Sequence, residues 1–193
     1  GLGDVYKRQA IISPMKFLLS LFYIFLIVSN LINPAYSSDI AKGKELSVSC
    51  AACHGDNGIS LNPVWPKLAG QNPKYLASQL YEFRKGAEGN RNNAVMYGIA
   101  MTLSDSDIED LSAYYASLES KVGLTQDKYL DLGRNIYRGG NMEIKIQACI
   151  SCHGPNGQGN YAAAIPMLSG QHSQYTYQQL KNFQASVRSN DYN

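Results

Sequence analysis

Four cysteines occur in this 193-residue chain, and all of them lie in two copies of one short motif, Cys-x-x-Cys-His. Two cysteines three positions apart can reach the two vinyl groups on one edge of a porphyrin and form thioether bonds. The histidine that follows is then held beneath the ring, where an imidazole nitrogen can bind the iron. This spacing is typical of c-type haem attachment, so we expect two covalently bound haem c groups. Their predicted attachment sites are Cys50, Cys53, Cys149 and Cys152, and their predicted iron ligands are His54 and His153.

Three other kinds of site also use paired cysteines. An exported protein can form redox-active disulfides, but these leave the histidine after each pair unexplained. A four-cysteine zinc site usually separates its two pairs by about 15–20 residues, whereas 95 residues lie between Cys53 and Cys149. A thioredoxin-like site requires a βαβ context, which the pattern does not show. Haem attachment therefore explains both motifs best.

A second axial ligand for the first iron is expected downstream of His54, where the candidates are Met96 and Met101. A thioether opposite a histidine gives a low-spin iron with a raised potential. A methionine is also a common packing residue. We favour Met96, because it lies in a loop-like stretch with Asn92–Val95, whereas Met101 sits just before the predicted Ser104 helix cap.

The two motifs belong to an internal duplication of the chain. The matching residues are 99 positions apart at the cysteines and 100 apart from Pro66 onward, so that Pro66–Gln71 corresponds to Pro166–Gln171. The same offset relates Tyr75, Gln79, Leu80 and Phe83 to Tyr175, Gln179, Leu180 and Phe183. The second copy also carries an insertion near Gly139 to Gln147.

Each copy is predicted to fold as helices joined by loops that are rich in glycine, asparagine and proline. Asn72 and Pro73 form an N-cap with proline at the first helical position. Ser104 and Asp107 form a capping box ahead of an apolar stripe at helical spacing. The range Thr125–Arg138 is predicted to open the second copy as a helix. Strand patterns are hard to find, and the predicted fold class is therefore all-α.

The N-terminal region has the pattern of a secretory signal peptide. Met15 and Lys16 precede an apolar run, Phe17–Ile32, which is followed by small residues at Ala35 and Ser37. We expect residues 15–37 to be removed on export. The alternative is an uncleaved membrane anchor, although a span needs about 20 apolar residues. Residues 1–14 fit neither a signal nor a domain, and we expect them not to belong to the natural coding sequence.

The predicted domains are residues 38–120 and residues 121–193. Alignment of the two copies indicates that the second is incomplete at its C-terminus, with about 30 residues fewer than the first. The counterpart of Met96 would then lie at or beyond Asn193. Neither Met142 nor Met167 is placed to serve instead, so the sixth ligand of the second iron is not predicted.

Charge excludes one class of partner. The whole chain carries 17 basic and 15 acidic residues; without residues 1–37, which hold three basic residues and one acidic residue, it carries 14 of each. A nucleic-acid-binding protein would show a basic stripe. We therefore expect no nucleic-acid partner.

The sequence resembles the cytochrome c4 family, the periplasmic dihaem members of the class I cytochromes c. The resemblance runs from about Ile40 to Asp191. Its motifs are Ala52–Gly55, Pro66–Gln71, Leu103–Asp105, Ala113–Tyr115, Leu132–Gly140, Gly170–His172 and Arg188–Asp191. It implies two small all-α domains, each with one His/Met haem, and it implies Met96 as the first iron's ligand. It also implies a periplasmic electron carrier that passes electrons from a redox protein donor to a membrane respiratory acceptor such as a terminal oxidase, with no small-molecule substrate.

Two functional alternatives stay open. One is a dihaem enzyme of the peroxidase or thiosulfate dehydrogenase type, in which one iron keeps a labile position. The other is a cytochrome subunit of a larger complex.

Among the remaining polar residues, Gln71, Arg91 and their second-copy counterparts could bind haem propionates. Alternatively, the glutamines could belong to a loop turn and the arginines could be solvated charges. We expect His172 to be a surface or cap residue.

Overall fold

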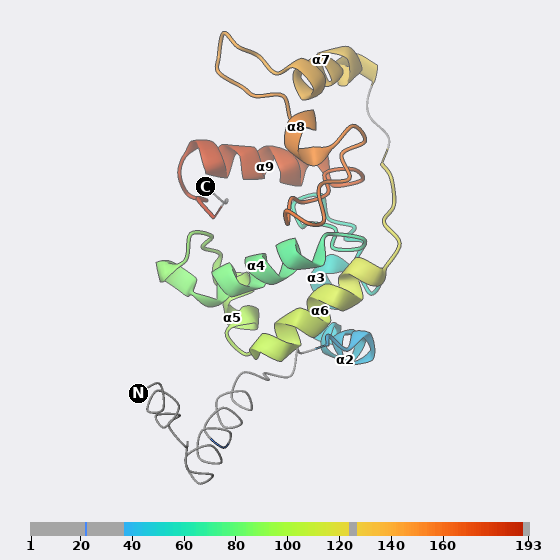
Figure 1. Ribbon diagram of the computed structural model, residues 1–193, viewed down its shortest axis with the longest axis vertical. Helices are drawn as coiled ribbons and strands as arrows, with labels where there is room; N and C mark the ends of the chain where they lie inside the picture. Colours follow the sequence, from blue (N-terminus) through green and yellow to red (C-terminus); the bar gives the residue numbers. More distant parts are fainter. Residues whose placement is uncertain (1–21, 23–36, 124–126, 191–193) are drawn as a thin grey trace, which may run out of the picture. The chain divides into compact units, whose positions relative to one another are not determined.

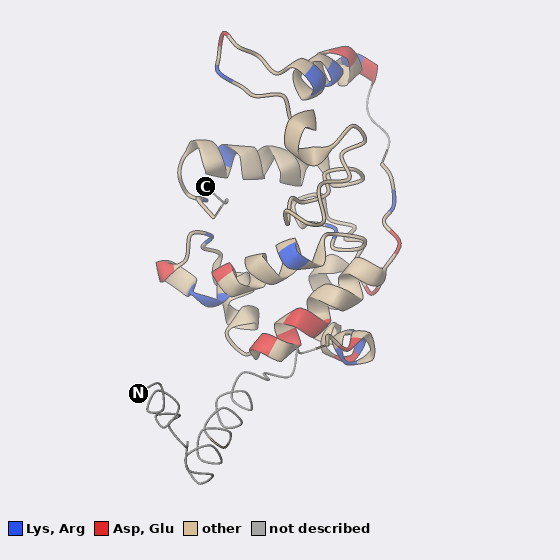
Figure 2. Cartoon of the chain, viewed as in Figure 1, with Lys and Arg blue, Asp and Glu red and all other residues tan. Residues whose placement is uncertain are grey.

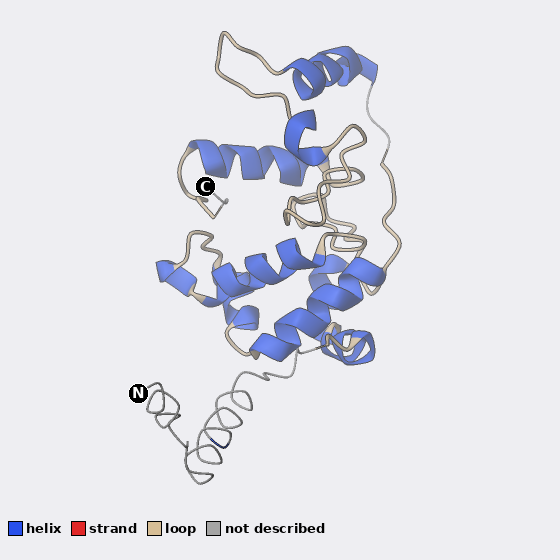
Figure 3. Ribbon diagram, in the orientation of Figure 1, coloured by secondary structure: helices blue, strands red, loops and turns tan. Residues whose placement is uncertain are grey.

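The computed structural model of the protein describes residues 22, 37–123 and 127–190. In these ranges the secondary structure consists of helices and three isolated bridges, with no strand (Figure 3). The predicted all-α class is therefore confirmed. Residues 1–14 and nearly all of the predicted signal segment, residues 15–37, lie outside the described residues. Among the described helices, none is long and apolar enough to cross a membrane.

The chain from Ser38 onward forms one compact unit that contains both copies of the duplication. The helices of the first copy, shown in Figure 1, are α2 (Ile40–Leu46), α3 (Val48–His54), α4 (Pro73–Arg84), the 3₁₀ helix η2 (Gly86–Glu88), α5 (Ala94–Ala100) and α6 (Asp105–Ser117). Those of the second copy are α7 (Asp127–Gly139), α8 (Ile150–His153) and α9 (Ser173–Gln184).

The two predicted helix caps are present in the first copy. The side chain of Asn72 accepts hydrogen bonds from the backbone N–H groups of Lys74 and Tyr75, and Pro73 opens α4. Ser104 and Asp107 form the reciprocal capping box of α6. Acidic residues crowd the N-terminal half of α6 (Figure 2), where the positive end of the helix dipole stabilises them. The sequence patterns at these two helix starts therefore act as predicted.

The core of the first copy lies where α2 and α4 pack on α6. Its buried centre consists of Leu76, Leu111, Tyr114 and Tyr115. The crossing of α2 and α6 is close, because a Cβ at Gly43 would overlap the backbone carbonyl of Asp110. Only glycine fits this position.

The second copy differs from the first at its opening helix. The loop between α7 and α8 contains the predicted insertion and is closed by a bridge between Asn141 and Ile146. Helix α7 contains no buried residue. Gly133, the counterpart of Gly43, has no atom within 4 Å of a Cβ built on it. Within the described residues, therefore, α7 has no packed neighbour of the kind that α6 provides for α2.

The two glycines make a matched pair of substitutions. Gly43→Ala should lower the free energy of unfolding by about 1–3 kcal/mol, because the methyl group overpacks the helix crossing. Gly133→Ala should be neutral or stabilise by up to about 1 kcal/mol, because alanine favours the helix and meets nothing. Urea unfolding of both variants, followed by circular dichroism, measures the difference; equal effects at the two sites would contradict the close crossing.

Candidate functional site

The first Cys-x-x-Cys-His motif lies on the last turns of α3. Cys50 and Cys53 are three positions apart, so their side chains share one face of the helix. Gly55 ends the helix with a φ of 79°, a conformation that glycine adopts without strain. None of the four cysteines forms a disulfide. The backbone thus presents two thiols and one imidazole side by side, as thioether attachment requires.

The His54 ring is held in a fixed orientation and in its neutral form. Its Nδ1 lies 2.8 Å from the carbonyl oxygen of Pro66, which can only accept, so Nδ1 carries the proton and Nε2 keeps its lone pair. His54 is only 7% exposed. This burial lowers the pKa of His54, although the hydrogen bond to Pro66 opposes the shift in part. A neutral imidazole with a free Nε2 is the form that binds a metal.

The second motif repeats this geometry. Cys149 caps α8, and Cys152 and His153 lie on that helix. The Nδ1 of His153 lies 2.9 Å from the carbonyl oxygen of Pro166. Pro166 is the counterpart of Pro66, so both histidines donate to the same position of the duplicated loop. The donor set of each copy, two thiols and one oriented imidazole, fits covalent haem c.

Met96 lies in a helix and not in the loop that the sequence analysis predicted. It occupies the first turn of α5, where its backbone N–H donates to the Oδ1 of Asn93, the N-cap residue. Met96 is half-buried, whereas Met101, which ends the same helix, is 54% exposed. Helix α5 packs against α4. Met96 is therefore the better enclosed of the two candidates.

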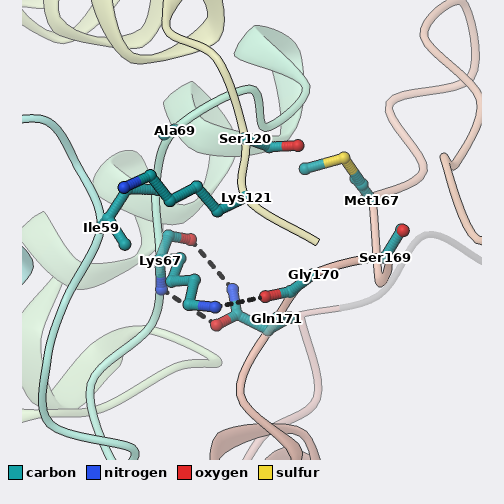
Figure 4. A pocket seen from close by; sticks show the side chains of 9 residues that line it. All are labelled: Ile59, Lys67, Ala69, Ser120, Lys121, Met167, Ser169, Gly170 and Gln171. Atoms are coloured by element: carbon teal, nitrogen blue, oxygen red, sulfur yellow. Dashed lines mark hydrogen bonds between the residues drawn. The ribbon is translucent and has the colours of Figure 1, made fainter. Parts of the chain in front are cut away.

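Two glutamines join the copies by exchanged hydrogen bonds. Gln171 accepts from the backbone N–H of Lys67 at 2.9 Å and donates to the Lys67 carbonyl at 2.9 Å, and Lys67 Nζ donates to Gly170 (Figure 4). Gln71 makes the mirrored pair with the backbone of Met167, at 2.7 and 2.9 Å. Both side-chain amide atoms of Gln71 are thus used within the protein. Its backbone N–H also donates to the carbonyl of Leu68 at 3.2 Å, so Gln71 closes a loop turn, one of the two predicted roles.

The next residue in each copy extends this interface. Asn72 donates from its side-chain amide to the carbonyl of Asn160 at 3.0 Å. His172, the counterpart of Asn72, places its Nε2 2.9 Å from the carbonyl of Ser60 in the first copy. His172 is also the N-cap residue of α9, although its side chain makes no cap hydrogen bond. His172 therefore occupies a helix-cap position, as predicted. Its side chain does not cap the helix and instead contacts the other copy.

Two arginines meet near the other end of the interface. Arg91 and Arg188 are only 8% and 5% exposed, and a backbone bridge pairs them. Arg91 donates to Gln79 at 2.6 Å and to the hydroxyl of Tyr175 at 2.6 Å. Arg188 donates to the mirrored partners, Gln179 at 2.8 Å and Tyr75 at 3.0 Å. Each guanidinium also stacks on a phenylalanine of its own copy, Phe83 or Phe183.

These two buried charges have neutral partners. Within the described part of the chain, no carboxylate makes an ion pair with Arg91 or Arg188. Burial raises the pKa of Tyr175, so its phenol stays protonated and supplies no negative charge. A buried cation is costly unless an anion compensates it. The arrangement therefore fits an anionic group, as the propionates of a haem would supply.

The chain is all-α, and each of its two copies places a Cys-x-x-Cys-His motif beside the same kind of proline-containing loop. This arrangement defines a c-type cytochrome with two haem sites. The family model Cytochrome c matches residues 40–119 and 133–192. Cytochrome c4 of Azotobacter vinelandii is 40% identical over 161 residues, which cover 80% of this chain and 77% of that protein. The thiosulfate dehydrogenase electron acceptor of Thiomonas intermedia is 38% identical over 150 residues, which cover 75% and 67%.

A crystal structure of reduced cytochrome c4 from Pseudomonas stutzeri is similar in fold, with a TM-score of 0.78 and 38% identity over 81% of this chain and 86% of that chain. The chain belongs to the cytochrome c family and, within it, to the cytochrome c4 proteins. It is a dihaem electron-transfer cytochrome with covalently bound haem c, as the sequence predicts.

The arginine pair yields a stability prediction. Arg188→Met should lower the free energy of unfolding by about 2 kcal/mol, because Gln179 and Tyr75 lose a charged donor inside the protein. Arg134→Met is the control, since Arg134 is exposed and, among the residues that the structure describes, forms an ion pair only with Asp131 on the same helix. For this variant we expect a change within about 0.5 kcal/mol. Denaturant unfolding measures both; similar losses would mean that Arg188 does not hold the copies together.

Proposed function

We propose that this protein carries electrons in the periplasm, one at a time, from a redox protein donor to a membrane respiratory acceptor such as a terminal oxidase. The observation that carries the proposal is the matched presentation of His54 and His153, each oriented by a proline carbonyl. Two histidines with the same orientation, His54 buried and His153 partly buried, suit a carrier, whose haems receive and release electrons without binding a substrate. The haem iron supplies the one-electron chemistry.

We assign the haem-binding residues as follows. Cys50 and Cys53 would hold the first haem covalently, and His54 and Met96 would bind its iron. Cys149 and Cys152 would hold the second haem covalently, and His153 would bind its iron. The support is the helical placement of each cysteine pair, the orientation of both imidazoles and the partial burial of Met96. The role of the chain's own residues is to orient these ligands and to exclude water.

We also assign Arg91 and Arg188 to the haem propionates. The support is their burial together with neutral hydrogen-bond partners only, which leaves two positive charges for an anion to compensate. A cation beside a propionate also offsets the negative charge that iron gains on reduction. The arginines would therefore raise both potentials while they join the two copies.

Similarity to a named electron acceptor favours one donor class. The Thiomonas intermedia relative is described as an electron acceptor of thiosulfate dehydrogenase. We propose that this chain can likewise accept electrons from an enzyme of that kind. The competing proposal is that the chain oxidises thiosulfate itself, which would need an iron with a labile position.

Carbon monoxide binding tests the ligand assignment. After export with haem maturation, intact mass should show two covalent haems. Met96→Ala should then increase the number of carbon monoxide molecules bound per reduced chain by one, because the thioether is lost from the first iron. Met101→Ala, the matched control, should bind as the unaltered protein does. An increase in Met101→Ala alone would move the ligand to Met101, and the absence of covalent haem would refute the proposed function.

Thiosulfate separates the carrier from the enzyme. The oxidised protein should stay oxidised when mixed with thiosulfate alone. It should be reduced, with the haem α-band appearing, once a catalytic amount of a thiosulfate dehydrogenase is added. Reduction by thiosulfate without the enzyme, at a rate proportional to protein concentration, would instead establish the enzyme role.

A further inference from the structure

One peptide group in each copy connects the haem histidine to the opposite copy. The peptide that joins Pro66 to Lys67 accepts a hydrogen bond from His54 Nδ1 through its carbonyl. The N–H of the same peptide donates to Oε1 of Gln171, which belongs to the second copy. Figure 4 shows Gln171 reaching across to both backbone groups of Lys67. His54 and Gln171 are therefore bonded to the two ends of one amide.

The second copy contains the mirrored connection. The Pro166 carbonyl accepts from His153 Nδ1 at 2.9 Å, and the N–H of the same peptide, on Met167, donates to Gln71 Oε1 at 2.7 Å. Gln71 is 5% exposed, so this contact is shielded from water. Two independent occurrences of the same chain of bonds show that it is a property of the interface and not of one loop.

Hydrogen bonds that share one peptide group reinforce each other. When the N–H of a peptide donates, electron density moves toward its carbonyl oxygen, which becomes a better acceptor. A better acceptor for Nδ1–H makes the imidazole a more basic ligand. A more basic axial ligand stabilises ferric iron, so the reduction potential falls. The glutamine acceptor therefore acts on the histidine through the shared peptide group.

We propose that each interface glutamine is a positioning residue for the haem of the opposite copy: Gln171 lowers the reduction potential of the first haem, and Gln71 lowers that of the second. The proposal rests on the haem attachment of the family and assigns these residues a function beyond holding the copies together. Other polar groups near this contact are the N–H of His172, which also donates to Gln171, and Nζ of Lys67, which donates to Gly170. Neither of them is bonded to the Pro66 carbonyl.

The test uses the exported holoprotein labelled with ¹⁵N-histidine, which contains only three histidines. In Gln171→Met, the acceptor for the Lys67 N–H is lost at nearly constant size. The assigned Nδ1–H signal of His54 in the reduced protein should move upfield and exchange faster with solvent. The potential of the first haem should rise, while the signal of His153 and the potential of the second haem stay unchanged. Gln71→Met should give the crossed result.

Two further variants separate tuning from a loosened interface. Gln171→Glu keeps an oxygen acceptor for the Lys67 N–H, so the His54 signal should stay at or downfield of its original position. His172→Ala removes the contact with Ser60 across the interface but leaves the peptide contact, and the first haem should be unaffected. The proposal is overturned if Gln171→Met leaves the His54 signal and the potential of the first haem unchanged, or shifts the potentials of both haems equally. It is also overturned if His172→Ala shifts the potential of the first haem as much as Gln171→Met does. Intact mass is measured first, because the absence of covalent haem would refute the proposed function itself.

Discussion

The hydrogen bond from histidine Nδ1 to a proline carbonyl is the interaction on which the rest of this structure depends. An imidazole can bind iron only when one ring nitrogen is free and the ring is neutral. The carbonyl fixes the tautomer, and burial disfavours the protonated form. Helix α3 ends at Gly55, and the loop that follows leads to Pro66. Together they bring Nδ1 of His54 and the carbonyl oxygen of Pro66 within hydrogen-bond distance. The same hydrogen bond occurs a second time, between Nδ1 of His153 and the carbonyl of Pro166.

The interface between the copies is built from the same loops. Pro66 and Pro166 each precede a residue whose backbone is hydrogen-bonded to a glutamine of the other copy. The orientation of each histidine and the contact between the copies are therefore linked. Backbone donors and acceptors also make the clamp insensitive to the side chains at positions 67 and 167, which are lysine in one copy and methionine in the other. The duplicated chain can therefore differ in sequence at this contact and keep its geometry.

Much of the fold and of the haem site could be predicted from the sequence, because the signals are local. Cys-x-x-Cys-His, the Asn72–Pro73 start and the Ser104 capping box each act within a few residues, and all appear in the structure as expected. The helix around Met96 was missed, because it has only seven residues and depends on the Asn93 cap more than on an apolar stripe. The acceptor role of Pro66 has no side-chain signature at all.

Contacts between the copies could not be predicted for a different reason. Gln71 and Arg188 resemble ordinary loop residues in the sequence, and their partners lie about 100 residues away. The one available signal was that Gly-Gln is repeated 100 residues later, close to the 99-residue offset of the haem motif. This repetition indicated that the glutamines matter, but it did not identify their partners. Only the folded structure shows that the repeated residue of one copy binds the backbone of the other.

The exchanged bonds have an evolutionary consequence. Gln71 contacts the second copy as Gln171 contacts the first, and Tyr75 and Arg188 are mirrored by Tyr175 and Arg91. A surface that pairs with its own counterpart is isologous, the kind that forms two-fold homodimers. A single-copy ancestor with these residues would have been self-complementary before its gene was duplicated. Fusion would then have changed a contact that depends on protein concentration into one that is always present, and freed each half to diverge.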